Sequence, residues 1–348
     1  MQGSNPEFEW LVIGAGPAGI AAVGKLIDAG VSPHRIGWMD PDFQVGDFGK
    51  KWNRVPSNTK NALFLRFLNE SKSFAFQSRP SPFEIETLDP NGHCPLQSVV
   101  EPLQWITERL KRQVRAIEDF ALGLNLAGKR WEVKTKRNVY FAKKVILAIG
   151  SEPKTLSHSG FETLSLETAL NEEKLAEAVK PSDRIAVFGS SHSAVLVLAN
   201  LTRCKVEKIV QFHRSPHRYA IPMQDWILFD DTGLKGFAAE WAKEHLDGTL
   251  PPSLKRVSLS HPSFEEALSL CNKGIYAVGF ERRKAPLLEQ YKNPHYDDKT
   301  GIIAPGLFGI GIAYPQAKYS PLGHLEHRVG LWKFMDYLNE VLPIWQAS

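Results

Sequence analysis

The glycine-rich segment near the N-terminus constrains the fold more than any other feature of the sequence. An apolar run, Trp10–Ile13, leads directly into Gly14-Ala15-Gly16-Pro17-Ala18-Gly19, and apolar residues recur at helical spacing after it. The pattern predicts a buried strand, a tight turn and a helix. In such a unit Gly14 permits the turn, Gly16 lets the backbone approach a diphosphate, and Gly19 lets the helix pack close to the strand.

An acidic residue follows at the distance that this unit requires for a nucleotide. The next predicted strand, Ile36–Met39, ends in Asp40, whose carboxylate could accept hydrogen bonds from an adenosine ribose. A glycine turn that only joins a strand to a helix is the alternative, but the order of strand, helix and acid argues against it. We therefore predict a dinucleotide at the helix N-terminus, bound by Gly14, Gly16, Pro17, Ala18, Gly19 and Asp40.

A weaker copy of the same unit begins at Arg184. The strand Arg184–Phe188 leads into Gly189-Ser190-Ser191-His192-Ser193-Ala194 and then into an apolar helix, Val195–Leu201. Only the first of the three glycines remains, although Ser191 and Ala194 are small enough for close approach. An unrelated strand, turn and helix is the alternative. We predict a second dinucleotide, bound by Gly189, Ser190, Ser191, His192 and Ser193.

The strand after the second turn ends in basic residues rather than an acid. Ile209–Phe212 runs into His213, Arg214 and Ser215. A guanidinium here would attract the 2′-phosphate that distinguishes NADPH from NADH. We therefore predict Arg214 and Ser215 as cofactor contacts and NADPH as the preferred coenzyme. A solvated basic loop is the alternative.

In this order the elements resemble the two-dinucleotide-binding-domain flavoproteins, and within them the flavin-containing and N-hydroxylating monooxygenases. Ala148-Ile149-Gly150 with Pro153 is similar to the A-T-G-x-x-x-x-P segment of that group, and Tyr276–Phe280 to its A-T-G-Y segment. Gly189–Ala194 is similar to G-S-G-Q-S-A. The sequence departs from the group in three places: it has no F-x-G-x-x-x-H fingerprint, its A-T-G segments lack the threonine, and Gly309–Ala313 stands where a Gly-Asp pair precedes the last helix.

The resemblance also implies residues at the flavin. Gly49-Lys50-Lys51-Trp52 is similar to a G-G-x-W segment that lies along the flavin, and Ser57-Asn58-Thr59 to a T-N-T stretch. It therefore implies that Trp52, Ala148, Gly150 and Gly311 bind FAD. It also implies that Asn58 is catalytic, with its amide near the flavin face. A turn residue beside Pro56 is the alternative for Asn58.

The resemblance implies an α/β fold with two Rossmann-like dinucleotide-binding domains. A chain of 348 residues is long enough for two cores. We expect an FAD-binding domain of residues 1–155 and 275–348, with an NAD(P)H-binding domain of residues 156–274 inserted in it. We also expect the strands Lys144–Gly150 and Gly274–Phe280 to join the first sheet, and a helix opened by Ser320 and Pro321 to run through Phe334.

For function, the resemblance implies an NADPH-dependent flavin monooxygenase that oxygenates a small nucleophilic substrate at nitrogen or sulfur. A flavin reductase or oxidase without oxygen insertion and a non-catalytic FAD-binding regulatory protein are the alternatives. A disulfide reductase needs two neighbouring cysteines, whereas Cys94, Cys204 and Cys271 are far apart in the sequence. The segment Tyr219–Phe264 matches no motif.

The composition and charge of the chain limit the kinds of molecule that it is expected to bind. The net charge of +4 is small and the basic residues are scattered, so we expect a small-molecule substrate and no nucleic acid. The longest apolar run contains Gly189 to Ser193 and does not read as a membrane span. We expect no metal, no membrane and, without a visible export signal, a cytoplasmic protein. The sequence leaves open whether the protein forms a homodimer.

Overall fold

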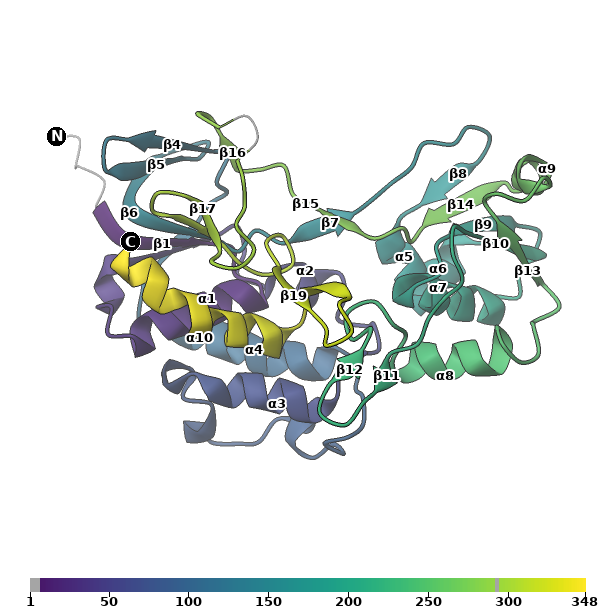
Figure 1. Cartoon of the computed structure of the whole chain (residues 1–348), viewed down its shortest axis with the longest axis horizontal. Coiled ribbons are helices and arrows are strands. Elements are labelled where there is room, and N and C mark those ends of the chain that lie inside the picture. The colour runs from purple at the N-terminus through teal and green to yellow at the C-terminus, as the bar shows by residue number, and fades with distance from the viewer. Residues whose placement is uncertain (1–6, 292–293) are drawn as a thin grey trace.

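Two sheets organise the chain, and each is built around one of the glycine turns (Figure 1). The computed structural model describes residues 7–291 and 294–348. The first sheet has the order β16-β4-β5-β6-β1-β2-β3, and β18 pairs with both β6 and β17. Its strands are β1 (Glu7–Ile13), β2 (Ile36–Asp40), β3 (Arg115–Glu118), β4 (Gly123–Ala127), β5 (Arg130–Lys134), β6 (Val139–Leu147), β16 (Leu287–Leu288), β17 (Ile302–Ala304) and β18 (Leu307–Gly309).

Strand β1 is central because its side chains are apolar and buried between two layers. It runs parallel to β2 and to β6, with Ile13 level with Met39 on one side and Leu147 on the other. The carboxyl ends of these parallel strands therefore meet at one edge, where ligands bind in α/β sheets. β4, β5 and β6 form an antiparallel meander.

Helices cover one face of the first sheet, below it in Figure 1. α1 begins at Pro17 in the glycine turn and packs Ile20 and Val23 into the core. The helices of this part are α1 (Pro17–Asp28), α2 (Gly46–Lys50), α3 (Asn61–Glu70), α4 (Gln97–Lys111) and α10 (Leu331–Ala347). Short 3-10 turns span Pro33–Arg35, Lys72–Phe74, Phe76–Ser78 and Glu84–Glu86.

The second sheet is parallel throughout, with the order β13-β10-β9-β14-β8. α7 is buried from Ala194 to Leu201 because it packs between this sheet and the neighbouring helices. The strands are β8 (Glu162–Leu164), β9 (Arg184–Phe188), β10 (Lys208–His213), β13 (Leu254–Ser258) and β14 (Lys273–Tyr276). The helices are α5 (Leu166–Leu170), α6 (Glu172–Ala178), α7 (His192–Arg203), α8 (Gly236–His245) and α9 (Phe264–Ser269).

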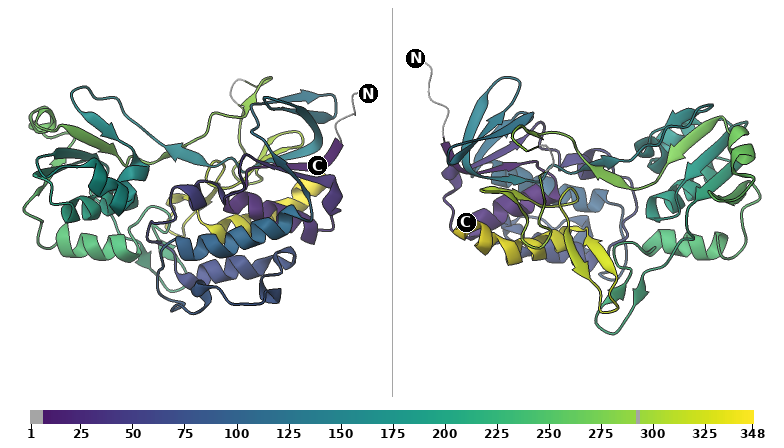
Figure 2. Two further views of the ribbon diagram at one scale, coloured as in Figure 1. Left: turned by 180° about the vertical axis from the view of Figure 1, so that it is seen from behind. Right: turned by 45° about the horizontal axis from the view of Figure 1, so that its top comes forward.

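A two-stranded ribbon connects the two parts (Figures 1 and 2). β7 (Ser151–Pro153) leads out of the first part and pairs antiparallel with β15 (Phe280–Arg282), which leads back. The expectation that Gly274–Phe280 joins the first sheet is wrong, because β14 pairs with β8 and β9. We propose that the second crossing lies in β15, a few residues after the predicted limit at 274. The domain division is otherwise kept as a proposal.

The predicted helix from Ser320 to Phe334 is also wrong in its first half. β19 (Gln316–Tyr319) and β20 (Leu325–Arg328) form a hairpin, and the helix begins only at Leu331, after Gly330. Ser320 donates its backbone N–H to the carbonyl of His324 and accepts from the His324 N–H through Oγ. The Ser-Pro pair therefore makes a hairpin turn, and Gly323 supplies a positive φ of 78° in that turn.

A second hairpin, β11 (Ile221–Pro222) with β12 (Ile227–Leu228), lies in the segment that matched no motif. It extends from the second part toward the hairpin β19–β20 (Figure 1). Within residues 7–291 and 294–348, every helix is too short or too polar to span a lipid bilayer.

Candidate functional site: a cleft between two glycine turns

A cleft of about 1240 Å³ lies between the two parts of the molecule. The first part contributes the turn after β1, the end of β2 and residues 55–60, and the second part contributes the start of α7 and residues 219–240. Pockets for a single small ligand usually measure about 300 to 1000 Å³. The cleft is therefore large enough for more than one ligand.

The first glycine turn is built so tightly that side chains are excluded from it. Gly14 has a φ of +108°, and its N–H donates to the Met39 carbonyl at 2.8 Å. A Cβ on Gly14 would lie 2.3 Å from the Ala148 carbonyl oxygen, and one on Gly19 only 1.9 Å from the Gly14 carbonyl oxygen. The roles predicted for Gly14 and Gly19 in the turn and in close packing therefore have a direct steric cause.

The start of α1 faces the cleft with its backbone donors available. Gly16 caps the helix without a side-chain hydrogen bond, and the first turn carries no acidic residue. A Cβ on Gly16 would come no closer than 3.9 Å to another heavy atom, the Val45 carbonyl oxygen. Open space therefore lies beside the positive end of the helix. A diphosphate fits this arrangement.

Asp40 lies in the cleft wall, but its carboxylate is already engaged by the backbone. Oδ2 accepts from the Ala15 N–H at 2.7 Å, and Oδ1 accepts from the N–H groups of Phe43 and Asp42 at 2.8 and 3.1 Å. Burial raises the pKa of Asp40, while these three hydrogen bonds act in the opposite direction. Asp40 thus holds the turn in shape, and its contact with a ribose stays a prediction.

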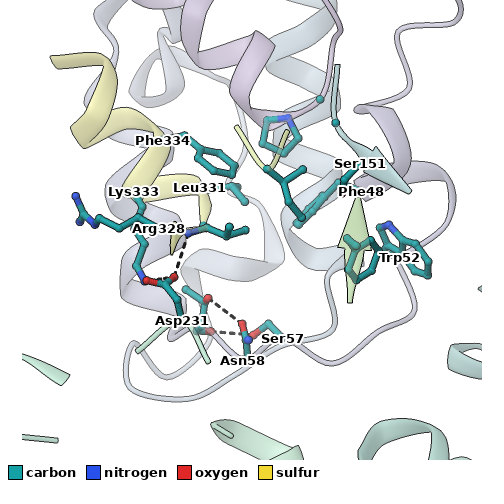
Figure 3. Close-up of a pocket in the computed structure, with 18 of the residues that line it drawn as sticks. Phe48, Trp52, Ser57, Asn58, Ser151, Asp231, Arg328, Leu331, Lys333 and Phe334 are labelled. Carbon is teal, nitrogen blue, oxygen red and sulfur yellow. Dashed lines mark hydrogen bonds and ion pairs between the residues drawn. The ribbon is translucent and has the colours of Figure 1, made fainter. Parts of the chain in front are cut away.

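Trp52 and Asn58 both line the cleft, as Figure 3 shows. The Trp52 ring meets Phe280 edge to face, with 6.0 Å between centroids. Asn58 sits in a loop fixed by the Ser57 N–H, which donates to the Cys94 carbonyl at 2.9 Å. The Asn58 Oδ1 accepts from the Thr59 hydroxyl at 3.3 Å. Asn58 is therefore held at the cleft surface, and its catalytic role stays a prediction.

The second glycine turn repeats the geometry of the first in spite of its different sequence. Gly189 has a φ of +130°, and its N–H donates to the Phe212 carbonyl at 2.8 Å. A Cβ on Gly189 would lie 2.3 Å from the Ala277 carbonyl oxygen, the same distance as at Gly14. Ser191 caps α7 without a side-chain hydrogen bond. A second anion site at a helix N-terminus is therefore chemically reasonable.

The predicted contacts of the second turn divide into two groups. His192 and Ser193 line the cleft, whereas Gly189, Ser190 and Ser191 do not. The Nδ1 atom of His192 is buried without a hydrogen-bond partner among the described residues. Burial lowers the pKa of His192 to about 4, and the nearby Lys235 acts in the same direction. His192 is thus neutral at physiological pH and carries a polar atom that a ligand could satisfy.

Five more predicted cofactor contacts lie outside the cleft wall, namely Ala18, Gly19, Arg214, Ser215 and Gly311. Arg214 and Ser215 are exposed after β10. Gly311 is buried against α1, where a Cβ on it would lie 2.8 Å from the Cβ of Ala18, and its neighbour Ile312 reaches the cleft instead. Ala148 and Gly150 do line the cleft. The structure therefore brings together most of the predicted first site and only part of the second.

The sequence did not predict a cluster of basic side chains that lies beside Arg214. A smaller cavity of about 420 Å³ is lined by residues that include Arg256, His217 and Asp247. The Arg256 guanidinium donates to the Gln211 Oε1 at 2.9 Å, and His217 lies 3.0 Å from the Asp247 carboxylate. Arg256 is on β13 and more than 40 residues from Arg214, so no local motif could reveal that it lies near the same strand ends.

A second missed feature is a segment that crosses from one part to the other, which we call the strap (residues 219–236). The Lys333 amine is buried and lies 2.6 Å from Asp231 and 2.5 Å from Asp230 of the strap. The Val329 N–H also donates to the Asp231 carboxylate at 3.0 Å. Figure 3 shows Lys333 turned toward Asp231 at the cleft wall. The strap therefore fixes one side of the cleft through an ion pair between the two parts.

Comparisons with known proteins agree with this architecture. The model of the pyridine nucleotide-disulphide oxidoreductase family matches residues 8–228. The monooxygenase AgnR1 of Paecilomyces divaricatus is 31% identical, over 97% of this chain and 98% of that protein. An ornithine N-hydroxylase of Kutzneria sp. has a TM-score of 0.69 at 12% identity, over 98% of this chain and 99% of the other. A mutant flavin monooxygenase of Stenotrophomonas maltophilia has a TM-score of 0.67 at 15% identity, over 98% of both chains. The predicted α/β fold with two dinucleotide-binding domains is confirmed.

Proposed function

Because the chain belongs to the pyridine nucleotide-disulphide oxidoreductase family, we propose that it is an NADPH-dependent flavin monooxygenase. The predicted resemblance and the class of FAD- and NAD(P)H-dependent oxidoreductase are confirmed at the level of the family. The monooxygenase activity rests on the near full-length relative, and the use of NADPH rests on Arg214. The observation that carries the proposal is the pair of equivalent glycine turns whose helices begin at one cleft.

The proposal assigns the two cofactors to the two turns. The start of α1 and Gly16 would hold the diphosphate of FAD. Ala148, Gly150 and Trp52 would contact the other parts of the FAD. When bound, FAD supplies a hydride acceptor for NADPH and, once reduced, reactivity toward oxygen. His192 and Ser193 would meet the nicotinamide half of NADPH where they reach the same cleft.

The chain's own residues then position the reactants and limit water. The neutral His192 ring can share a hydrogen bond without adding charge to the site. Asn58, fixed in its loop, offers an amide that can donate to the substrate or to oxygen bound beside it. The strap closes one side of the cleft, which reduces the access of water to the reacting groups.

The cysteines give no support to disulfide reduction, in spite of the family's description. Cys94 and Cys271 are buried in different cores, and burial raises the pKa of each thiol to about 11. A thiol with such a pKa is protonated and unreactive near neutral pH. Among the described residues, no cysteine lines the cleft. A dithiol beside the flavin is therefore not part of the proposal.

The overall reaction we propose consumes one NADPH, one proton and one oxygen molecule. One oxygen atom enters a nucleophilic nitrogen or sulfur of the substrate and the other leaves as water, while NADPH supplies two electrons. The test mixes purified flavin-loaded protein with NADPH, first without oxygen and then with ¹⁸O₂ and methyl phenyl sulfide. We expect bleaching of the flavin absorbance by NADPH and ¹⁸O in the sulfoxide.

Two other outcomes would contradict the proposal and identify the alternatives. Bleaching followed by stoichiometric hydrogen peroxide, without labelled product from a panel of sulfides and amines, indicates a reductase or oxidase. Bound FAD that NADPH does not bleach indicates a regulatory protein. Denatured protein with FAD added serves as the control for free flavin in both experiments.

A further inference from the structure

Exposed apolar side chains gather on two neighbouring hairpins at the edge of the cleft. Ile221, Met223 and Ile227 of the hairpin β11–β12 are 46%, 43% and 38% exposed, and Tyr319 and Leu325 of β19–β20 are 68% and 48% exposed. We call these five side chains the apolar mouth. Such a group on the surface of a folded protein usually marks a place where an apolar ligand or partner binds.

The two hairpins lie side by side although about 100 residues separate them in the chain (Figures 1 and 2). The Phe229 ring, just after β12, lies 5.1 Å from the His324 ring between centroids. The Asp231 N–H approaches the Glu326 carboxylate at 3.4 Å. These contacts fix the distance between the hairpins, so the mouth is a defined entrance.

The apolar character continues from the mouth into the cleft. Trp226 and Ile227 line the cleft from the strap, and Tyr319 lines it from β19. Leu331 and Phe334, at the start of α10, also line the cleft and are labelled in Figure 3. A substrate that entered here would therefore meet apolar side chains from both parts of the molecule.

Most charges at this end of the cleft are already paired. Asp230 and Asp231 bind Lys333, and Lys235 binds Asp230 at 2.8 Å. Separating a buried ion pair to serve a ligand would be costly. Glu326 accepts from the Asp231 N–H at 3.4 Å, and burial raises its pKa. Arg328 donates to the Gln316 Oε1 at 2.9 Å.

The remaining charged side chains at this end of the cleft favour neither a cationic nor an anionic ligand. Asp225 and Lys318 line this end, both are exposed, and they have opposite charges. Three cations or titratable groups and one acid line the cleft at α8 or beside its start, namely Lys60, His93, Lys243 and Glu240, and burial lowers the pKa of His93. The wall next to the mouth thus has an apolar surface and little net charge to hold a charged group.

From this arrangement we infer that the substrate is an uncharged, mainly apolar molecule that enters between the two hairpins and lies against Trp226 and Ile227. The inference rests on the proposed function and narrows its substrate class. A charged amine or amino acid would have to leave water without gaining a partner of opposite charge. An apolar molecule gains free energy from the same burial.

The first experiment compares three probes that share a ring and a sulfur atom but differ in charge. They are methyl phenyl sulfide, 4-(methylthio)benzoate and 4-(methylthio)benzylamine, the last a cation at pH 7.5. Binding to the flavin-loaded protein is measured at equilibrium by calorimetry and by the change in flavin absorbance. We expect the neutral probe to bind at least about tenfold more tightly than either charged probe. Equal or tighter binding of a charged probe overturns the inference.

The second experiment uses a matched pair of substitutions. Ile227 and Leu259 are 38% and 41% exposed, but only Ile227 lines the cleft. We expect Ile227→Asn to raise the Kd of the neutral probe about fivefold. Leu259→Asn should leave that Kd unchanged. Equal effects of the two substitutions, or no effect of either, contradict the assignment of the mouth.

These measurements separate the inference from the proposed function. The binding of the probes needs no turnover, so a protein that binds the neutral probe selectively but forms no sulfoxide would disprove only the oxygenation. A protein that oxygenates but prefers a charged probe would disprove only the inference. Flavin content and the thermal midpoint of each variant show whether it is folded.

Discussion

The turns at Gly14 and Gly189 share one backbone geometry but differ in how much freedom their sequences leave. At both, a Cβ on the first glycine would lie 2.3 Å from the carbonyl oxygen of the residue directly after a neighbouring parallel strand, Ala148 after β6 and Ala277 after β14. At the third position the first turn needs Gly19, whereas the second contains Ala194, whose Cβ is accommodated. The shared turn therefore requires glycine only at its first position, and the residue at the third position depends on how closely the helix approaches the turn.

The turns also differ in the groups that stand beside them. The first is held by Asp40, which is buried and accepts three backbone hydrogen bonds. At the corresponding place β10 ends in His213, and basic residues follow it. The Gln211 amide donates to the Gly189 carbonyl at 2.9 Å, just as the Trp38 indole N–H donates to the Gly14 carbonyl at 3.0 Å. The first turn is therefore held by a buried carboxylate, whereas the second is followed by exposed residues that include Arg214.

The largest expected effect tests the difference at the third position. Gly19→Ala places a Cβ 1.9 Å from the Gly14 carbonyl oxygen, so we expect a loss of about 3 kcal/mol in the free energy of unfolding and loss of bound FAD. Urea unfolding and the flavin content of the purified protein measure both effects. A stable, fully yellow variant would show that the first turn tolerates alanine as the second does.

The next effect concerns the basic end of the second turn. Arg214→Ala should reduce the preference for NADPH over NADH by roughly 1.5 to 3 kcal/mol, because a charge-assisted contact with the 2′-phosphate is lost. Rates of anaerobic flavin reduction with both coenzymes measure the preference. Arg218→Ala, an exposed change nearby, is the control. An unchanged preference in Arg214→Ala would assign the phosphate to another group, with Arg256 the first candidate.

A third prediction uses the neutral histidine at the start of α7. The pKa of His192 is lowered to about 4 in the folded protein, whereas an unfolded histidine titrates near 6.5. Stability is therefore lost as the pH falls from about 6.5 toward 4, and at pH 5 the loss is about 2 kcal/mol. His192→Gln should remove this part of the pH dependence in urea unfolding, while His34→Gln at an exposed site should keep it. The same slope in both variants would contradict a buried neutral ring.

The smallest expected change in stability comes from the reverse substitution in the second turn, alanine to glycine. Ala194→Gly makes the second turn match the first at its third position, but it adds a glycine to α7. We expect a loss of only about 1 kcal/mol, from the lower helix propensity of glycine. NADPH affinity should change little. A loss of several kcal/mol in the free energy of unfolding would show that the Ala194 methyl group also stabilises the protein by packing.

The sequence predicts those parts of the molecule that local residues determine. The first unit from Trp10 to Asp40 follows from a buried strand, three glycines and helical periodicity, all within 31 residues. The second turn is also predictable, because its first glycine and small residues satisfy the same local sterics. The candidates Ala148, Gly150, Trp52 and Asn58 line the cleft, and their roles in FAD binding and catalysis stay predictions.

The failures involve contacts between distant residues. Ser320 and Pro321 suit a helix start as well as a hairpin turn, and the pairing of β19 with β20 decides between them. Gly274–Phe280 is an apolar strand that would fit either sheet, and its pairing with β8 and β9 decides. The bond from Lys333 to Asp231 joins residues 102 positions apart, so periodicity carries no trace of it.

The two connections between the parts of the molecule have unequal mechanical roles. The ribbon of β7 and β15 could twist while keeping its few hydrogen bonds, whereas the bond of Lys333 to Asp231 cannot survive a swing of one part against the other. Any such swing must strip this amine of its counter-charges and rehydrate all three groups. Because the side chains of Lys333 and Asp231 are only 4% and 7% exposed, dissolved salt screens this ion pair weakly, and the resistance to a swing should persist at high ionic strength.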